Sequence, residues 1–224
     1  KQGEFALALI DYFGDEVKEQ IYSLPTSKVS YEFTRKIYEL LEMPVEHIMT
    51  DFTTFDLIGE NKETNIKQLQ DMKFDVVVGN PPYQEMISKG RSLAKQLFPK
   101  FMEVGIGLQP QCLSLITPTK WFTADAQDNS FPKLRAVAKE NNHFEIIVSD
   151  NGKKVFANTE IGGICYFLWR PEYQGDVLFV EQSDDGEDAL YRPLFEDGLD
   201  IILPLNKYAS IIKKVVGKDF IPLN

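Results

Sequence analysis

Short apolar runs alternate with stretches of helical periodicity along most of the chain. The runs that predict β-strands lie at residues 20–24, 47–50, 74–78, 112–116, 144–149 and 161–169, with one further strand at 176–181 outside the main alternation. The stretches that predict helices lie at residues 3–12, 28–41, 99–104, 131–141 and 207–216. An alternation of this kind is typical of an α/β domain in which helices connect the strands of a parallel sheet.

The run Phe74–Val78 is nearly all apolar and is followed by Gly79-Asn80-Pro81-Pro82-Tyr83. It predicts a central strand, buried on both faces and stopped by the prolines. Ligands of open α/β sheets bind beyond the carboxyl ends of strands, where Asn80 would stand. Proline fixes φ and lacks an N–H, so the carbonyls of Asn80 and Pro81 have little freedom, and Tyr83 adds an aromatic face. The segment fits a planar amino group, and a simple strand-ending loop remains the alternative.

Asn-Pro-Pro-Tyr after a strand resembles the motif of the N6-adenine DNA methyltransferases. The likeness extends over the segments FDVVVGNPPYQ, LSLITPTKWF and KVFANTEIGGICYFLW, and it covers residues 3 to 169. The chain is most similar to the methylase portion of type II restriction–modification enzymes. This resemblance implies a Rossmann-like S-adenosylmethionine-dependent methyltransferase fold, which has a mostly parallel central sheet, flanking helices and a late antiparallel strand.

The resemblance also implies an activity, the transfer of a methyl group from S-adenosylmethionine to N6 of adenine in double-stranded DNA, within a restriction–modification system. Methyltransferases acting on protein glutamine or on RNA share the NPPY motif, and they remain an alternative. A non-catalytic relative that binds DNA or a partner is a second alternative, which the departures described below keep open.

Roles for the catalytic residues follow from the resemblance. Asn80 would accept a hydrogen bond from the adenine amino group through its side chain, and Pro81 would accept another through its carbonyl. Pro82 completes the catalytic segment. Tyr83 would stack on an adenine that has flipped out of the duplex, and Phe156 takes the position of a second stacking aromatic residue, with an ordinary core phenylalanine as the alternative.

The implied cofactor contacts lie earlier in the chain. Asp51 and Phe52 resemble the acidic–aromatic pair at the adenine of S-adenosylmethionine, and a helix-capping role is the alternative for Asp51. Gly3 and Glu4, in KQGEF, resemble the end of the glycine-rich loop beside the methionine moiety.

The sequence departs from the family at two cofactor positions. Lys1 stands where a further glycine is usual, and the strand that precedes the loop in the family is not in the sequence. Pro25-Thr26-Ser27 stands where an acid that binds the ribose is common, so Thr26 or Ser27 would substitute or ribose binding would be lost. We therefore expect this chain alone to bind cofactor and DNA weakly.

The net charge of the chain bears on the expected binding to DNA. The net charge is −10, whereas nucleic-acid-binding proteins usually have a basic patch. Residues 181–200 carry a net charge of −7, which leaves −3 for the remainder, and they predict a solvated acidic loop. We expect a catalytic domain over residues 1–180. Residues 181–224 would form an acidic loop and a connector toward a target-recognition region or subunit outside this chain.

Other site classes find little support in the sequence. Cys112 and Cys165 lie in apolar runs, which predicts buried thiols in a reducing compartment and a cytoplasmic protein. No apolar run reaches the roughly 18 residues of a membrane span. His47 and His143 have no neighbours at metal-ligand spacing, so no metal site is expected.

Overall fold

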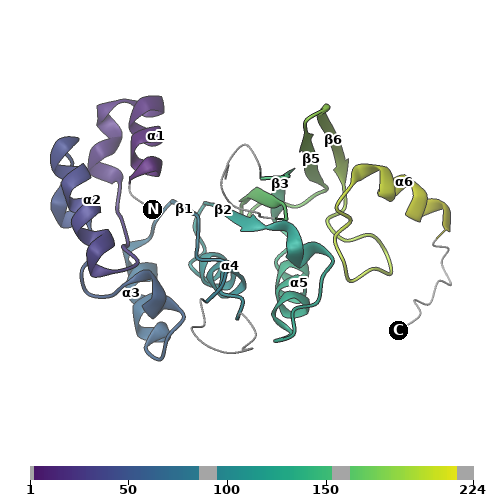
Figure 1. Ribbon diagram of the computed structural model, residues 1–224, viewed down its shortest axis with the longest axis horizontal. Helices are drawn as coiled ribbons and strands as arrows, with labels where there is room; N and C mark the ends of the chain where they lie inside the picture. The colour runs from purple at the N-terminus through teal and green to yellow at the C-terminus, as the bar shows by residue number, and fades with distance from the viewer. Residues whose placement is uncertain (1–2, 86–94, 153–161, 216–224) are drawn as a thin grey trace. The chain divides into compact units, whose positions relative to one another are not determined.

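The computed structural model describes residues 3–85, 95–152 and 162–215 (Figure 1). The chain divides into two compact units, Lys1–Lys73 and Phe74–Asn224. The first unit has three α-helices, α1 (Glu4–Phe13), α2 (Lys28–Leu40) and α3 (Lys62–Met72), and the 3-10 turns η1 (Asp15–Gln20), η2 (Val45–His47) and η3 (Thr54–Leu57).

The first unit has a small apolar core with little regular β-structure. The core consists of Ala6, Ile21, Tyr38, Met43 and Ile48. The strands predicted at 20–24 and 47–50 are reduced to one parallel bridge between Ser23 and Ile48, so the prediction of two full strands is wrong. The predicted start of α2 is confirmed, because the Ser27 hydroxyl accepts a hydrogen bond from the Ser30 backbone N–H at 3.2 Å.

The second unit is built on one six-stranded sheet with the strand order β1-β2-β4-β3-β5-β6. The strands are β1 (Val76–Gly79), β2 (Cys112–Pro118), β3 (Phe144–Asp150), β4 (Ile164–Trp169), β5 (Val177–Ser183) and β6 (Gly186–Arg192). Pairing is parallel for β1 with β2 and for β3 with β5, and antiparallel elsewhere. Four strands thus run in one direction, but most pairings are antiparallel, so the sheet is mixed. The expected late antiparallel strand is β4.

Helices α4 (Phe98–Gly107) and α5 (Ser130–Glu140) lie beneath the sheet, and α6 (Asn206–Val215) lies beyond β6 (Figure 1). A short 3-10 turn, η4 (Thr119–Phe122), follows β2 directly. Phe98, Met102 and Leu134 of these helices pack into one core with the inward residues of the strands. That core includes the fully buried Trp121 of η4 and Trp169 of β4.

Strand β1 is a strand, as predicted, but it is not a central buried one. It is an edge strand of the six-stranded sheet, and Val76 and Val78 are 56% and 38% exposed. An apolar run cannot by itself separate a central strand from an edge strand, because both accept β-branched residues.

Residues 181–192 of the acidic stretch belong to a hairpin that continues the sheet and do not form the predicted loop, whereas residues 193–200 are irregular. Strand β5 runs across residue 180 and pairs with β3, and β6 turns back along it. The loop prediction failed for this strand because both acidic residues of β6, Glu187 and Asp188, are exposed, which gives the strand the composition of a loop.

Arg192, the one cation of this stretch, is buried at the base of the hairpin. Its Nε donates a hydrogen bond to Asn206 Oδ1 at 3.0 Å, and its guanidinium lies 4.0 Å from the centre of the Phe179 ring. Burial lowers the pKa of Arg192, while Glu196 and Glu181 partly oppose this shift. Glu196 is itself buried, so this cation offsets the charge of an acid that has little access to water.

Replacing this buried cation tests its role in stability. Arg192→Met should lower the free energy of unfolding by about 3 kcal/mol, because it leaves buried carboxylate charge without a counter-charge. Urea denaturation followed by the fluorescence of Trp121 and Trp169 measures the effect within this unit. Asp184→Asn, in the exposed hairpin turn, should change the stability by no more than about 0.5 kcal/mol. Equal effects of the two substitutions would contradict this role for Arg192.

Candidate active site

The predicted catalytic loop is fixed at both ends. It leaves β1 at Gly79, whose register partner on β2 is Leu115. At the other end Leu97 N donates to Tyr83 O and Glu85 N donates to Lys95 O, both at 3.0 Å, which forms a short antiparallel ladder. The loop therefore has a backbone defined by hydrogen bonds on each side.

Within this loop the four residues differ in burial. Pro81 is buried, whereas Asn80, Pro82 and Tyr83 are half-buried. Among the described residues, no hydrogen-bond partner is recorded for the Asn80 side chain. The Asn80 amide is thus positioned by the backbone at the carboxyl end of β1, where a ligand of an α/β sheet would bind.

Tyr83 contributes a ring rather than a paired hydroxyl. Its ring meets that of Phe98 edge to face, with the centroids 6.3 Å apart. Burial, together with the nearby Cys165, raises the pKa of Tyr83 to about 12. The hydroxyl oxygen is buried and has no hydrogen-bond partner in the described part of the chain.

The thiol of Cys165 lies beside this ring and is fully buried, as predicted. Burial raises the pKa of Cys165 to about 11, although contacts with Thr117 and Trp121 oppose the shift. The Thr117 hydroxyl is 3.2 Å from the sulfur. A neutral thiol in this setting acts as a packing group behind Tyr83.

Three loops meet at the carboxyl ends of β1, β2 and β3. The loop after β1 carries Asn80, and the turn after β2 begins at Thr119. The connection from β3 to β4 ends at Gly163, whose carbonyl accepts a hydrogen bond from Thr119 N at 3.1 Å. Phe156 belongs to this connection but lies outside the described residues, so its stacking role stays a prediction.

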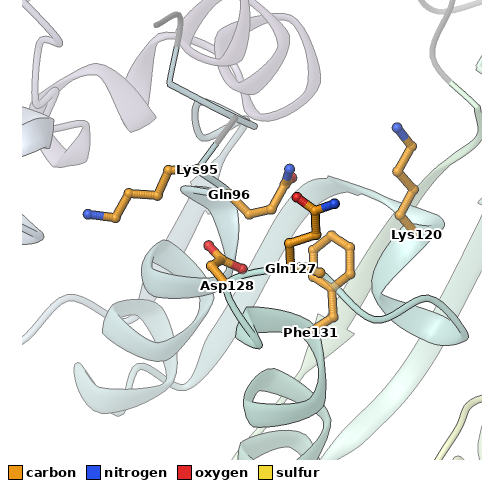
Figure 2. Close-up of a pocket in the computed structure, with 7 residues that line it drawn as sticks. Lys95, Gln96, Lys120, Gln127, Asp128 and Phe131 are labelled. Carbon is orange, nitrogen blue, oxygen red and sulfur yellow. The ribbon is translucent and has the colours of Figure 1, made fainter. Parts of the chain in front are cut away.

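A pocket of about 280 Å³ adjoins the catalytic loop in the same unit (Figure 2). It is lined by Lys95, Gln96, Lys120, Ala126, Gln127, Asp128 and Phe131. Phe131 contacts Phe98, the ring that also supports Tyr83. The sequence analysis assigned no role to these polar residues. The position of Lys120 just after β2 was a usable signal, since the same rule singled out Asn80.

The predicted adenine contacts of the cofactor belong to the first unit. Asp51 is exposed, and its Oδ2 accepts a hydrogen bond from Gln68 Nε2 at 2.9 Å. Within the described residues its other oxygen has no recorded partner, and the contact of Asp51 with a cofactor amine stays a prediction. Phe52 is only 7% exposed, which leaves little more than a ring edge for a purine.

Gly3 has a local structural explanation. It precedes α1 with a φ of 95°, and a Cβ at this position would lie 2.9 Å from Ile37 Cγ2. Positive φ and close packing both favour glycine here. Glu4 is an exposed residue of the first helical turn. The roles of both residues toward a cofactor stay predictions.

The capping of α2 affects which residue could bind the ribose hydroxyls, Thr26 or Ser27. The Ser27 hydroxyl is engaged by the helix it caps, and the Pro25 carbonyl accepts from Thr54 N at 2.9 Å. Thr26 is therefore the better placed of the two candidate substitutes for the missing acid.

Residues 3–85, 95–152 and 162–215 hold neither a metal-binding cluster nor a membrane-spanning helix. No group of three or more metal-ligating side chains lies together there. In the same ranges, no helix is long and apolar enough to cross a bilayer.

The sequence and the fold are similar to those of known proteins. An uncharacterized adenine-specific methylase of Mycoplasma pneumoniae is 42% identical over 157 residues, which are 66% of this chain and 36% of that protein. This chain thus spans about a third of the length of that relative.

Two solved structures share the fold. The methyltransferase subunit of a type I restriction–modification system from Streptococcus thermophilus has a TM-score of 0.54 and 16% identity, over 96% of this chain and 46% of that one. The M protein of the type I restriction enzyme EcoKI has a TM-score of 0.52 and 13% identity, over 80% and 39%. A family model for the Eco57I restriction-modification methylases matches residues 11–156. That match covers more than half of the sequence, and the chain belongs to the Eco57I restriction-modification methylase family.

Proposed function

We propose that this chain forms the catalytic part of a DNA methyltransferase that modifies N6 of adenine with S-adenosylmethionine, within a restriction–modification system. The observation that carries the proposal is the loop Asn80–Tyr83, held at the carboxyl end of β1 in a chain of this family. The family match favours DNA over protein glutamine or RNA. A target-recognition region outside this chain and a cytoplasmic location remain predictions, whereas the boundary predicted near residue 180 falls within β5.

The chemistry explains why this loop needs two acceptors. The lone pair of the adenine amino group is delocalised into the purine, so the nitrogen is a poor nucleophile. Hydrogen bonds to the Asn80 side chain and the Pro81 carbonyl favour a tetrahedral nitrogen whose lone pair points at the methyl donor. Because the loop backbone is fixed before the base arrives, little reorganisation is needed during the reaction.

Tyr83 and Phe156 would hold the flipped base. An adenine within the duplex is not accessible to these acceptors, so it must leave the stack, and an aromatic face replaces part of the lost stacking. The orphaned Tyr83 hydroxyl supports a role for the ring alone.

Asp51 would accept from the exocyclic amine of the bound cofactor, and Phe52, Gly3 and Glu4 would complete its surroundings. The exposed, Gln68-oriented carboxylate of Asp51 supports this assignment. When bound, S-adenosylmethionine supplies an activated methyl group on a sulfonium centre.

Removing the first acceptor tests the mechanism. In the full-length protein, Asn80→Ala should lower the rate of methyl transfer to unmethylated DNA by on the order of a hundredfold or more, because one preorganised hydrogen-bonding group is lost. Incorporation of labelled methyl groups measures the rate, and circular dichroism checks the fold. A rate close to that of the wild type would remove Asn80 from the mechanism. An inactive wild-type protein would favour the non-catalytic alternative.

A pair of substitutions separates the Tyr83 ring from its hydroxyl. Tyr83→Ala should weaken binding of an extruded adenine by roughly 1–3 kcal/mol, the usual value of base–aromatic stacking. Tyr83→Phe should retain binding and leave stability unchanged or higher, because a desolvated hydroxyl without a partner is removed.

The stability at alkaline pH provides a second test of the Tyr83 hydroxyl. The neutral hydroxyl is favoured in the folded state, so Tyr83 should add to the loss of stability between about pH 10 and the folded pKa of about 12. Tyr83→Phe should lack that part of the loss. Equal damage by both substitutions would give the hydroxyl a role that this proposal lacks.

The cofactor assignment is tested by Asp51→Asn in the full-length protein. Losing a charged acceptor should weaken S-adenosylmethionine binding by about tenfold, which calorimetry measures as a dissociation constant. Asp71→Asn, an exposed change on α3, serves as the matched control and should leave the constant unchanged. An unaltered constant for Asp51→Asn would exclude this carboxylate from the cofactor site.

A further inference from the structure

The pocket beside the catalytic loop has polar groups that the proposed chemistry does not use. Gln96 comes from the ladder that closes the loop, Lys120 from η4, and Gln127 from the segment before α5. In Figure 2 the side chains of Gln96 and Gln127 are drawn on one side of the pocket and that of Lys120 on the other. The Lys95 ammonium points away from this group.

The acidic residue of the pocket is already engaged by the backbone. Partial desolvation would raise the pKa of Asp128, but hydrogen bonds from Ser130 and from the Gln96 backbone N–H lower it below its usual range. The Ser130 N–H lies 3.1 Å from Asp128 Oδ1. Asp128 thus ties the ladder segment to the start of α5 and fixes two walls of the pocket.

Backbone donors engage the Asp128 carboxylate, whereas, in the part of the chain that the structure describes, the side chains of Lys120 and Gln127 are not engaged in this way. Within the described residues, the Lys120 ammonium forms no ion pair, and the Gln127 amide has no recorded hydrogen bond. Both side chains are exposed, and both carry N–H donors at the carboxyl edge of the sheet.

The backbone that carries Lys120 is rigid. The side chain of Arg135, buried within α5, donates from Nη1 to Trp121 O at 3.0 Å and to Ala124 O at 2.8 Å. Its Nη2 pairs with Asp125 at 2.8 Å. Trp121, next to Lys120, is fully buried. The ammonium therefore projects from a turn that is held from both sides.

Lys120 also lies next to the connection between β3 and β4. Its Cε is 3.8 Å from the place that a Cβ would take at Gly162. The lysine thus stands at the same edge as Asn80 and the end of the connection that contains Phe156.

We propose that Lys120 and Gln127 bind a phosphodiester of the DNA strand next to the flipped adenine. This inference rests on the proposed function. An ammonium and an amide that line one pocket offer N–H donors to the acceptor oxygens of a phosphate, and phosphate contacts set the position of a protein on DNA. Extruding a nucleotide rotates its backbone, so a fixed contact at the flanking phosphate holds the strand while Asn80 engages the base.

Salt dependence tests this contact in the full-length protein. The equilibrium constant for binding a labelled DNA duplex is measured over a range of salt concentrations. Each phosphate contact contributes about 0.9 to the slope of log K against log salt, so Lys120→Gln should reduce the magnitude of the slope by about that amount. Lys120→Arg should retain it. Lys214→Gln, an exposed change on α6 outside the pocket, is the matched control and should leave the slope unchanged.

Two substitutions of Gln127 test the second donor. Gln127→Glu should weaken binding more than Gln127→Ala, because it adds repulsion to the loss of a donor. Unchanged slopes for Lys120→Gln, or equal effects of the two Gln127 variants, would overturn the inference. If the wild type methylates adenine while Lys120→Gln keeps its slope, the phosphate contact fails and the proposed function stands. If Lys120→Gln loses slope but the wild type does not methylate adenine, the contact stands and the function fails.

Discussion

The antiparallel insertion of β4 between β2 and β3 is the constraint on which the candidate site depends. Ile164, the first residue of β4, pairs with Pro118 at the end of β2 and with Asp150 at the end of β3. The loops that follow these strands therefore start at one point of the sheet edge. Gly163 is needed there, because its φ is 108° and a Cβ would lie 2.7 Å from Thr119 Oγ1.

This edge separates two kinds of hydrogen-bonding group. The loop after β1 offers acceptors, from Asn80 and Pro81, and the turn after β2 offers donors, from Lys120 and the nearby Gln127. A nucleotide presents the complementary pair, an amino group on adenine and an anionic phosphate. Because β1 and β2 are adjacent and parallel, the loops that follow them lie at the same edge of the sheet.

Local signals in the sequence predict much of this fold and less of the site. The helical periodicity over residues 28–41 predicts α2, and the apolar runs of β2, β3 and β4 are found because burial dominates their composition. Helix α3 was missed, since only Leu69 of it is buried and its pattern is too polar to stand out. The NPPY loop was recognised because its residues are consecutive. The pocket was not, because tertiary hydrogen bonds from Arg135 and Asp128 shape it.

The order of the strands also reconciles a net charge of −10 with a proposed DNA surface. The acidic residues of β6 lie at one edge of the sheet, whereas the catalytic loop follows β1 at the other. Four strand spacings of about 4.8 Å separate β2 from β6, roughly 19 Å in all. The Debye length is about 8 Å at physiological salt, so repulsion from the hairpin is largely screened at Lys120. The sign of the local charge, rather than that of the whole chain, then decides how this edge meets a phosphate.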